Sequence, residues 1–156
     1  MIQQEQLDQF VRDFCAFVAQ QQLNGVSRVH LQETNAYVWG KIDEEMGGAA
    51  LELWSQHEQI TLAYSQTHWH IDPDGTTNQM EQLVREVEQI CFAIIEGKLL
   101  TYSVWQGERP LGGSSVEGAV EDAVQQGIAW FTNATTIHIK QWGKALITHR
   151  LAEDVQ

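Results

Sequence analysis

Two histidines and an aspartate stand at alternate positions in the segment His68-Trp69-His70-Ile71-Asp72. On a β-strand, alternate residues point to the same face, so His68, His70 and Asp72 would share one face while Trp69 and Ile71 take the other. Two imidazoles and a carboxylate can bind a transition metal. The alternative is the solvated face of a half-buried strand, because no further ligand stands nearby. His68 and His70 are therefore candidate metal ligands, and the sequence requires no cofactor.

No other part of the sequence carries a catalytic motif. Two cysteines, Cys15 and Cys91, fall on or beside the apolar stripes of predicted helices, so we expect buried free thiols. A cysteine nucleophile with a distant histidine partner is the alternative. The spacing of the remaining histidines shows no Ser-His-Asp or Cys-His grouping. An enzyme is thus the second interpretation of this chain, and a binding protein is the first.

The strongest chemical feature of the chain is its acidity. Twenty-one Asp and Glu against nine Lys and Arg give the 156 residues a formal net charge of −12. A field of this sign repels nucleic acid and anionic lipid, and it attracts cationic ligands and basic protein surfaces. Nucleic acid and membranes are therefore disfavoured, and a basic protein is the expected partner. The alternative is an acidity that serves solubility alone.

The acidity is concentrated in the first half of the chain, at two turns that each follow a tryptophan. Residues 1–78 carry a net charge of −8, and residues 79–156 carry −4. Tryptophan is prominent among the residues that anchor protein interfaces, and carboxylates beside it suit a basic surface. A position in the core is the alternative role for each tryptophan. The predicted partner-binding residues are Trp39, Asp43, Glu44, Glu45, Trp69, Asp72 and Asp74.

Three segments have the apolar spacing of three and four residues that is typical of an amphipathic helix. They span residues 4–23, 78–97 and 114–131. The third is predicted to begin at Ser114 because Ser114 and Glu117 resemble a capping box. The glycine-rich residues 107–113 before it are predicted to form a loop.

The remaining segments change to the period of two that is typical of strands. Four or five short strands fit the stretch before residues 72–75, which have the composition of a turn. Gly143-Lys144 suits a two-residue hairpin turn near the end of the chain. The strand regions are residues 26–72, 99–106, 135–142 and 145–151. An antiparallel sheet of about five to seven strands packed against three helices gives an α+β fold, predicted as a single domain over residues 1–156.

In size, acidity and layout the chain resembles the immunity proteins that neutralise bacterial nuclease toxins, and this resemblance rests on composition alone. It implies an inhibitor that offers carboxylates to the phosphate-binding surface of a basic toxin. The second interpretation is a small metal-dependent enzyme or ligand-binding domain that uses His68, His70 and Asp72. The third is a structural subunit that forms a homodimer. The sequence shows no secretory signal or membrane span, so a cytoplasmic protein is expected.

Overall fold

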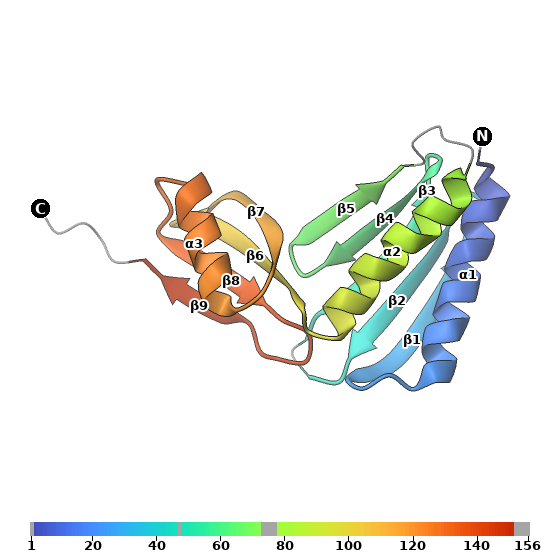
Figure 1. Cartoon of the computed structure of the whole chain (residues 1–156), viewed down its shortest axis with the longest axis horizontal. Helices are drawn as coiled ribbons and strands as arrows, with labels where there is room; N and C mark the ends of the chain where they lie inside the picture. The colour runs from blue at the N-terminus through green and yellow to red at the C-terminus, as the bar shows by residue number, and fades with distance from the viewer. Residues whose placement is uncertain (1, 47, 73–77, 152–156) are drawn as a thin grey trace, which may run out of the picture.

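The computed structural model describes residues 2–46, 48–72 and 78–151, and in them the chain forms three helices and two antiparallel sheets (Figure 1). The first sheet is a meander in which each strand pairs with the next along the chain. Its strands are β1 (Val26–Glu33), β2 (Val38–Glu44), β3 (Ala50–Gln56), β4 (Gln59–Tyr64) and β5 (Thr67–Ile71). The predicted α+β class is confirmed, and the strands divide between two sheets.

Two helices cover one face of the first sheet. α1 (Gln4–Gln21) precedes the sheet and α2 (Gln79–Ile95) follows it, and both lie across the same face in Figure 1. In β2 and β3 every second residue is accordingly buried against this helical layer. Both helices were predicted within two residues of their observed ends. The opposite face, here called the outer face, carries none of the described helices.

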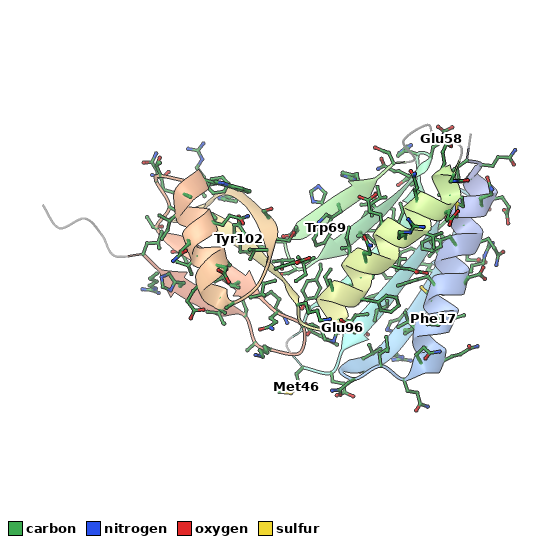
Figure 2. All side chains as sticks on the ribbon, in the orientation of Figure 1. Phe17, Met46, Glu58, Trp69, Glu96 and Tyr102 are labelled. Carbon is green, nitrogen blue, oxygen red and sulfur yellow. The ribbon has the colours of Figure 1, made fainter. Side chains whose placement is uncertain are left out.

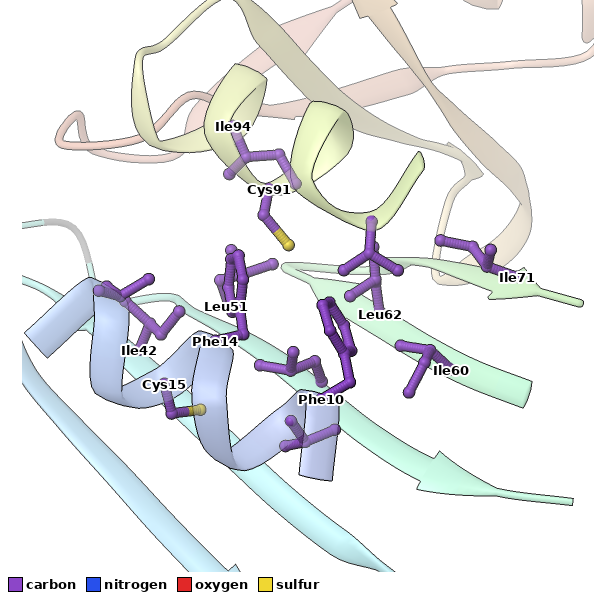
Figure 3. Close-up of a cluster of buried hydrophobic side chains, with 14 of the residues drawn as sticks. Phe10, Phe14, Cys15, Ile42, Leu51, Ile60, Leu62, Ile71, Cys91 and Ile94 are labelled. Carbon is purple, nitrogen blue, oxygen red and sulfur yellow. The ribbon is translucent and has the colours of Figure 1, made fainter. Parts of the chain in front are cut away.

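The core of this half lies between the helical layer and the first sheet. Phe10 and Phe14 reach into it from α1, Leu51 and Leu62 from the strands, and Ile94 from α2 (Figure 3). Each such side chain stabilises the fold by about 1.5–3 kcal/mol when it is fully buried. The apolar residues whose spacing predicts the two helices therefore also hold these helices against the sheet.

The second sheet has four strands and carries the third helix. Its strands lie in the order β7-β6-β8-β9, and α3 (Val120–Trp130) packs on one face. The strand bounds are β6 (Leu99–Gln106), β7 (Arg109–Glu117), β8 (Thr136–Lys140) and β9 (Ile147–Arg150). A second hydrophobic cluster, which includes Tyr102, Val104 and Ile137, fills the space between α3 and this sheet.

The glycine-rich segment is where the predicted secondary structure is wrong. Residues 109–117 form β7, which pairs with β6, whereas the sequence predicts a loop and the start of a helix there. Ser114 and Glu117 therefore lie in a strand and cap no helix. The N-terminus of α3 is instead capped by Asp122, whose carboxylate accepts a hydrogen bond from the Ala119 N–H at 2.7 Å. Pairing with β6 outweighs the local helical signal.

The terminal hairpin forms, but its turn is longer than the sequence predicts. β8 pairs with β9, and residues 141–146 join them in place of a two-residue turn at Gly143-Lys144. The extra residues contact the first half of the molecule. Trp142 is buried in the core of the first sheet, where its ring lies 5.7 Å from the ring of Tyr64.

A buried ion pair also joins the two sheets. The Nζ of Lys140, at the end of β8, lies 2.7 Å from a carboxylate oxygen of Glu44, at the end of β2, and both side chains are buried. Lys140 Nζ also donates hydrogen bonds to the backbone carbonyls of Gln141 at 2.9 Å and Lys144 at 2.7 Å. The carboxylate of Glu44 accepts hydrogen bonds from the N–H groups of Ala49 and Gly143. Both charges are therefore compensated inside the protein.

The packing of Trp142 against Gly25 gives a test of the contact between the two sheets. Gly25 has a φ of +81°, and a Cβ there would lie 2.9 Å from Nε1 of Trp142. We expect Gly25→Ala to lower the free energy of unfolding by about 2–4 kcal/mol, from left-handed strain plus the displaced indole. Gly48→Ala is the control, because Gly48 has a φ of +71° and no atom within 4 Å of the added Cβ. Urea denaturation measures the free energy of unfolding of each variant. An equal loss in Gly25→Ala and Gly48→Ala would contradict the contact between Gly25 and Trp142.

Candidate functional site

The two tryptophans that were predicted to anchor a partner lie on opposite faces of the first sheet. Trp39 is on the outer face, where it stands directly across from Trp54. Trp69 is paired with Leu62 on the inner face and packs against the core. The structure therefore does not bring Trp39 and Trp69 into one surface.

The acidic turn after Trp39 is also divided. Glu44 is buried and paired with Lys140, so its assignment as a surface contact is wrong: the carboxylate faces the junction of the sheets. Asp43 lies on the outer face, with an oxygen 2.8 Å from Nε2 of His30. Glu45 is the member of the three that is exposed.

The second acidic turn is described only in part. Asp72 is exposed directly after β5, and Asp74 lies outside the described residues. The ring centroids of His68 and His70 are 5.0 Å apart on the outer face. Nδ1 of His70 is also within hydrogen-bond distance of Thr61, at 3.1 Å. Across residues 2–46, 48–72 and 78–151, no group of three His, Cys, Asp or Glu is placed to hold a metal ion.

The two cysteines are buried and free, as predicted (Figure 3). Burial raises the pKa of Cys15 to about 11 and, together with smaller effects of nearby charges, raises the pKa of Cys91 as well. A thiol reacts through its thiolate, so we expect neither cysteine to react with Ellman's reagent in the native protein at about pH 8. Both should react once the protein is unfolded in urea. Rapid reaction of one native thiol would revive the prediction of a cysteine nucleophile.

An aromatic groove runs between α1 and α2 on the surface of the molecule. It has a volume of about 410 Å³, and its lining includes Phe10, Phe14 and Phe17 from α1 and Phe92 from α2. The ring of Phe92 lies 5.8 Å from that of Phe14 and 6.1 Å from that of Phe17. Phe17 is 46% exposed, and Figure 2 shows it on the side of α1 that faces α2. The groove therefore presents aromatic surface to solvent.

The helices that form this groove carry a net negative charge. Each has three acidic residues and one basic residue within its bounds. Both bases are already paired: Arg12 contacts Glu5 and Glu33, and Arg85 lies 3.5 Å from Glu81. These cations are therefore not available to neutralise the groove.

Two carboxylates line the groove itself, one from each helix. Asp13 and Glu88 are exposed beside the aromatic side chains. Asp13 accepts a hydrogen bond from the side-chain amide of Gln9 at 2.8 Å. Among the described residues, neither carboxylate forms an ion pair with a cation. A cationic group that approached the groove would therefore find two free partners next to apolar surface.

The outer face of the first sheet differs in charge from the helical layer. Its charged strand residues are Arg28, Lys41, Asp43 and Glu52, and they balance to zero. Asp43 is moreover engaged with His30, and it lies 3.8 Å from Lys41. The negative field is thus stronger over the helices, and the groove is the best candidate for binding a basic partner.

The apolar face predicted for the first helix includes Phe10, Phe14 and Phe17, but the sequence analysis assigned no role to Phe92 and missed the groove. A signal is present all the same: Asp13 stands four residues before Phe17, and Glu88 stands four residues before Phe92. Residues four apart lie on the same side of a helix, so each pair sets a carboxylate beside an aromatic ring. That the two pairs face each other depends on the sheet between the helices, which spacing alone does not reveal.

A comparison with protein-family models, curated proteins and solved structures found no match to this chain. None of the described helices is both long and apolar enough to cross a membrane. The function is therefore inferred from the groove, its aromatic lining and its charges.

Proposed function

We propose that this protein binds a basic protein partner through the groove between α1 and α2. The observation that carries the proposal is the pair of accessible rings in the groove, Phe17 at 46% exposure and the half-buried Phe92, flanked by the carboxylates Asp13 and Glu88, which form no ion pair with a described cation. Apolar surface provides affinity when it is buried, and charges beside it select a partner of opposite sign. The sequence predicts the sign of the partner, and the structure supports a different location for its contact.

The partner is expected to insert a bulky apolar side chain between Phe17 and Phe92, with Lys or Arg on either side. An amphipathic helix lying along a groove between two helices meets this requirement. The two carboxylates lie on opposite helices, so cations on both flanks of the inserted segment would be neutralised. The net charge of −12 would speed the encounter and make it sensitive to salt.

Inhibition of a nuclease toxin, the role of the immunity proteins that the composition resembles, would be one use of such a surface. A toxin of that class has a basic face that binds phosphates, and a carboxylate-flanked aromatic groove is complementary to it.

A designed peptide tests the binding chemistry directly. The probe is a fluorescent helix of Leu and Lys with its Leu residues at spacings of three and four, and anisotropy measures its binding to the full-length protein. We expect saturable binding that weakens several-fold as ionic strength rises from about 0.05 M to 0.5 M. A peptide of equal charge built from Gly and Lys is the control, because it lacks the apolar stripe.

Two results would overturn the proposal. Equal binding of the Gly and Lys peptide would show that the net charge alone attracts cations. Equal binding of a Leu and Glu helix would show that the groove does not select charge.

A further inference from the structure

A cleft at the junction of the two sheets lies apart from the aromatic groove. Its volume is about 460 Å³, which is within the usual range for a site that binds a small molecule. One wall is the start of β5 with the turn before it, including Gln66 and His68, and the other is formed by β6 and β7. Junctions between packed units are a common place for such sites.

The strand faces explain which side chains reach the cleft. Tyr102 and Val104 of β6 point to the face that packs under α3. Ser103 and Trp105 alternate with them, so they point to the uncovered face of the second sheet. His68 points to the outer face of the first sheet, opposite to Trp69. The cleft is therefore formed where two uncovered sheet faces meet.

Two contacts connect the walls of the cleft. The hydroxyl of Thr67 in β5 donates a hydrogen bond to the backbone carbonyl of Ser114 in β7 at 3.4 Å. The ion pair of Lys140 with Glu44 joins the same two sheets. Contacts of this kind between the walls hold the site in place before a ligand binds, which favours affinity.

The indole of Trp105 has a defined orientation in the wall. Its N–H donates a hydrogen bond to the hydroxyl oxygen of Ser103 at 2.9 Å. The ring of His138 meets it nearly edge-on, with centroids 5.9 Å apart and an interplanar angle of 76°. Trp105 is half-buried, so part of the indole faces the cleft. It offers a flat apolar surface on which a ring can stack.

Three polar side chains of the cleft, those of Gln66, His68 and Ser103, can form hydrogen bonds with a ligand. Among the described residues that line the cleft there is no Asp, Glu, Lys or Arg. The side chains of Gln66 and His68 form no hydrogen bond with other described residues, and the hydroxyl of Ser103 accepts one and can still donate its own proton. An ionised ligand would find no carboxylate, ammonium or guanidinium group among these residues to pair with. Groups that both donate and accept hydrogen bonds, next to a flat apolar surface, match a ring that carries hydroxyl groups.

We propose that this cleft binds a neutral saccharide, with the sugar ring stacked on Trp105 and its hydroxyl groups hydrogen-bonded to Gln66, His68 and Ser103. Neither the aromatic groove nor its acidic residues take part, so this site is independent of the proposed partner. The sugar can be free or attached to a protein, and the two sources present the same ring chemistry.

The test titrates the full-length protein with maltose, cellobiose and diacetylchitobiose, followed by ligand-observed NMR and tryptophan fluorescence. A neutral glycopeptide serves as the attached form, and tighter binding of the glycopeptide than of the free sugars would identify the attached source. We expect millimolar binding of at least one sugar, weakened about tenfold or more in Trp105→Ala and about fivefold in His68→Ala. Trp130→Ala is the control: Trp130 is 62% exposed on α3, away from the cleft.

His68→Ala keeps the test decisive if Trp105→Ala fails to fold, because His68 is exposed. Absence of binding by every sugar and by the glycopeptide would overturn the proposal. So would binding that is unchanged in His68→Ala, or tighter binding of adenosine or of glucuronate than of any neutral sugar.

Discussion

Replacing Lys140 by Met should lower the free energy of unfolding by about 3–5 kcal/mol, the largest loss that we expect from any single substitution in this chain. Lys140 is buried with Glu44, and the substitution leaves that carboxylate without a cation in a site shielded from water. Two hydrogen bonds to backbone carbonyls are lost as well. Urea denaturation followed by tryptophan fluorescence measures the loss.

A double variant distinguishes two effects on the free energy of unfolding: the destabilisation by an unpaired buried charge, and the stabilisation by the ion pair itself. Glu44→Gln with Lys140→Met removes both charges, and it should be more stable than Lys140→Met alone. Arg85→Met is the matched control, because Arg85 forms an exposed ion pair with Glu81 and should change stability by less than about 1 kcal/mol. If Lys140→Met lowers the free energy of unfolding by no more than Arg85→Met does, the ion pair of Lys140 with Glu44 does not hold the two sheets together.

The same experiment tests the predicted single domain. The two sheets have separate hydrophobic clusters, and Trp142, Lys140 and Glu44 connect them. If the halves unfold as one unit, fluorescence and circular dichroism will report one coincident transition in the unmodified protein. Two separated transitions would instead show two domains joined by this contact.

Reversing the charge of the groove should have the second large effect. We expect Asp13→Lys with Glu88→Lys to weaken binding of the Leu and Lys helix by about a hundredfold, because two attractive contacts become repulsive. Both residues are exposed, so the fold should tolerate the change. Fluorescence anisotropy at low salt measures the affinity, and circular dichroism checks the helices.

The control for net charge places the same substitutions elsewhere. Glu108→Lys with Glu121→Lys changes the total charge equally, and both residues are exposed in the second half of the chain. A comparable loss of binding in this control would mean that the groove has no special role. Phe17→Ala should weaken binding about tenfold or more without a large loss of stability, since Phe17 is 46% exposed.

The helices and the meander could be predicted because their signals are local. The apolar stripes of α1 and α2 repeat at helical spacing, and the strands of the first sheet alternate in polarity. β7 could not be predicted in this way. Its Gly112 and Gly113 have the composition of a loop, and only pairing with β6 makes the segment a strand.

The candidate site was less predictable than the fold. The composition predicts the sign of the partner, but Glu44 reads as a surface acid in the sequence and is neutralised by a lysine almost a hundred positions away. Trp39 and Trp69 likewise lie on opposite faces of the sheet. The face of each side chain depends on the register in which its own strand pairs with its neighbour. Which side chains meet across the molecule is a property of the tertiary fold.

The meander of the first sheet has a consequence for the time course of folding. Every strand in it pairs with its neighbour in sequence, so this half closes through short loops and should form quickly. Glu44 and Lys140 are instead far apart in the sequence, with β6, β7 and α3 between them, so their contact closes a long loop and we expect it to form after the meander. The ion pair is thus a late contact, and its removal should accelerate unfolding while leaving the refolding rate almost unchanged.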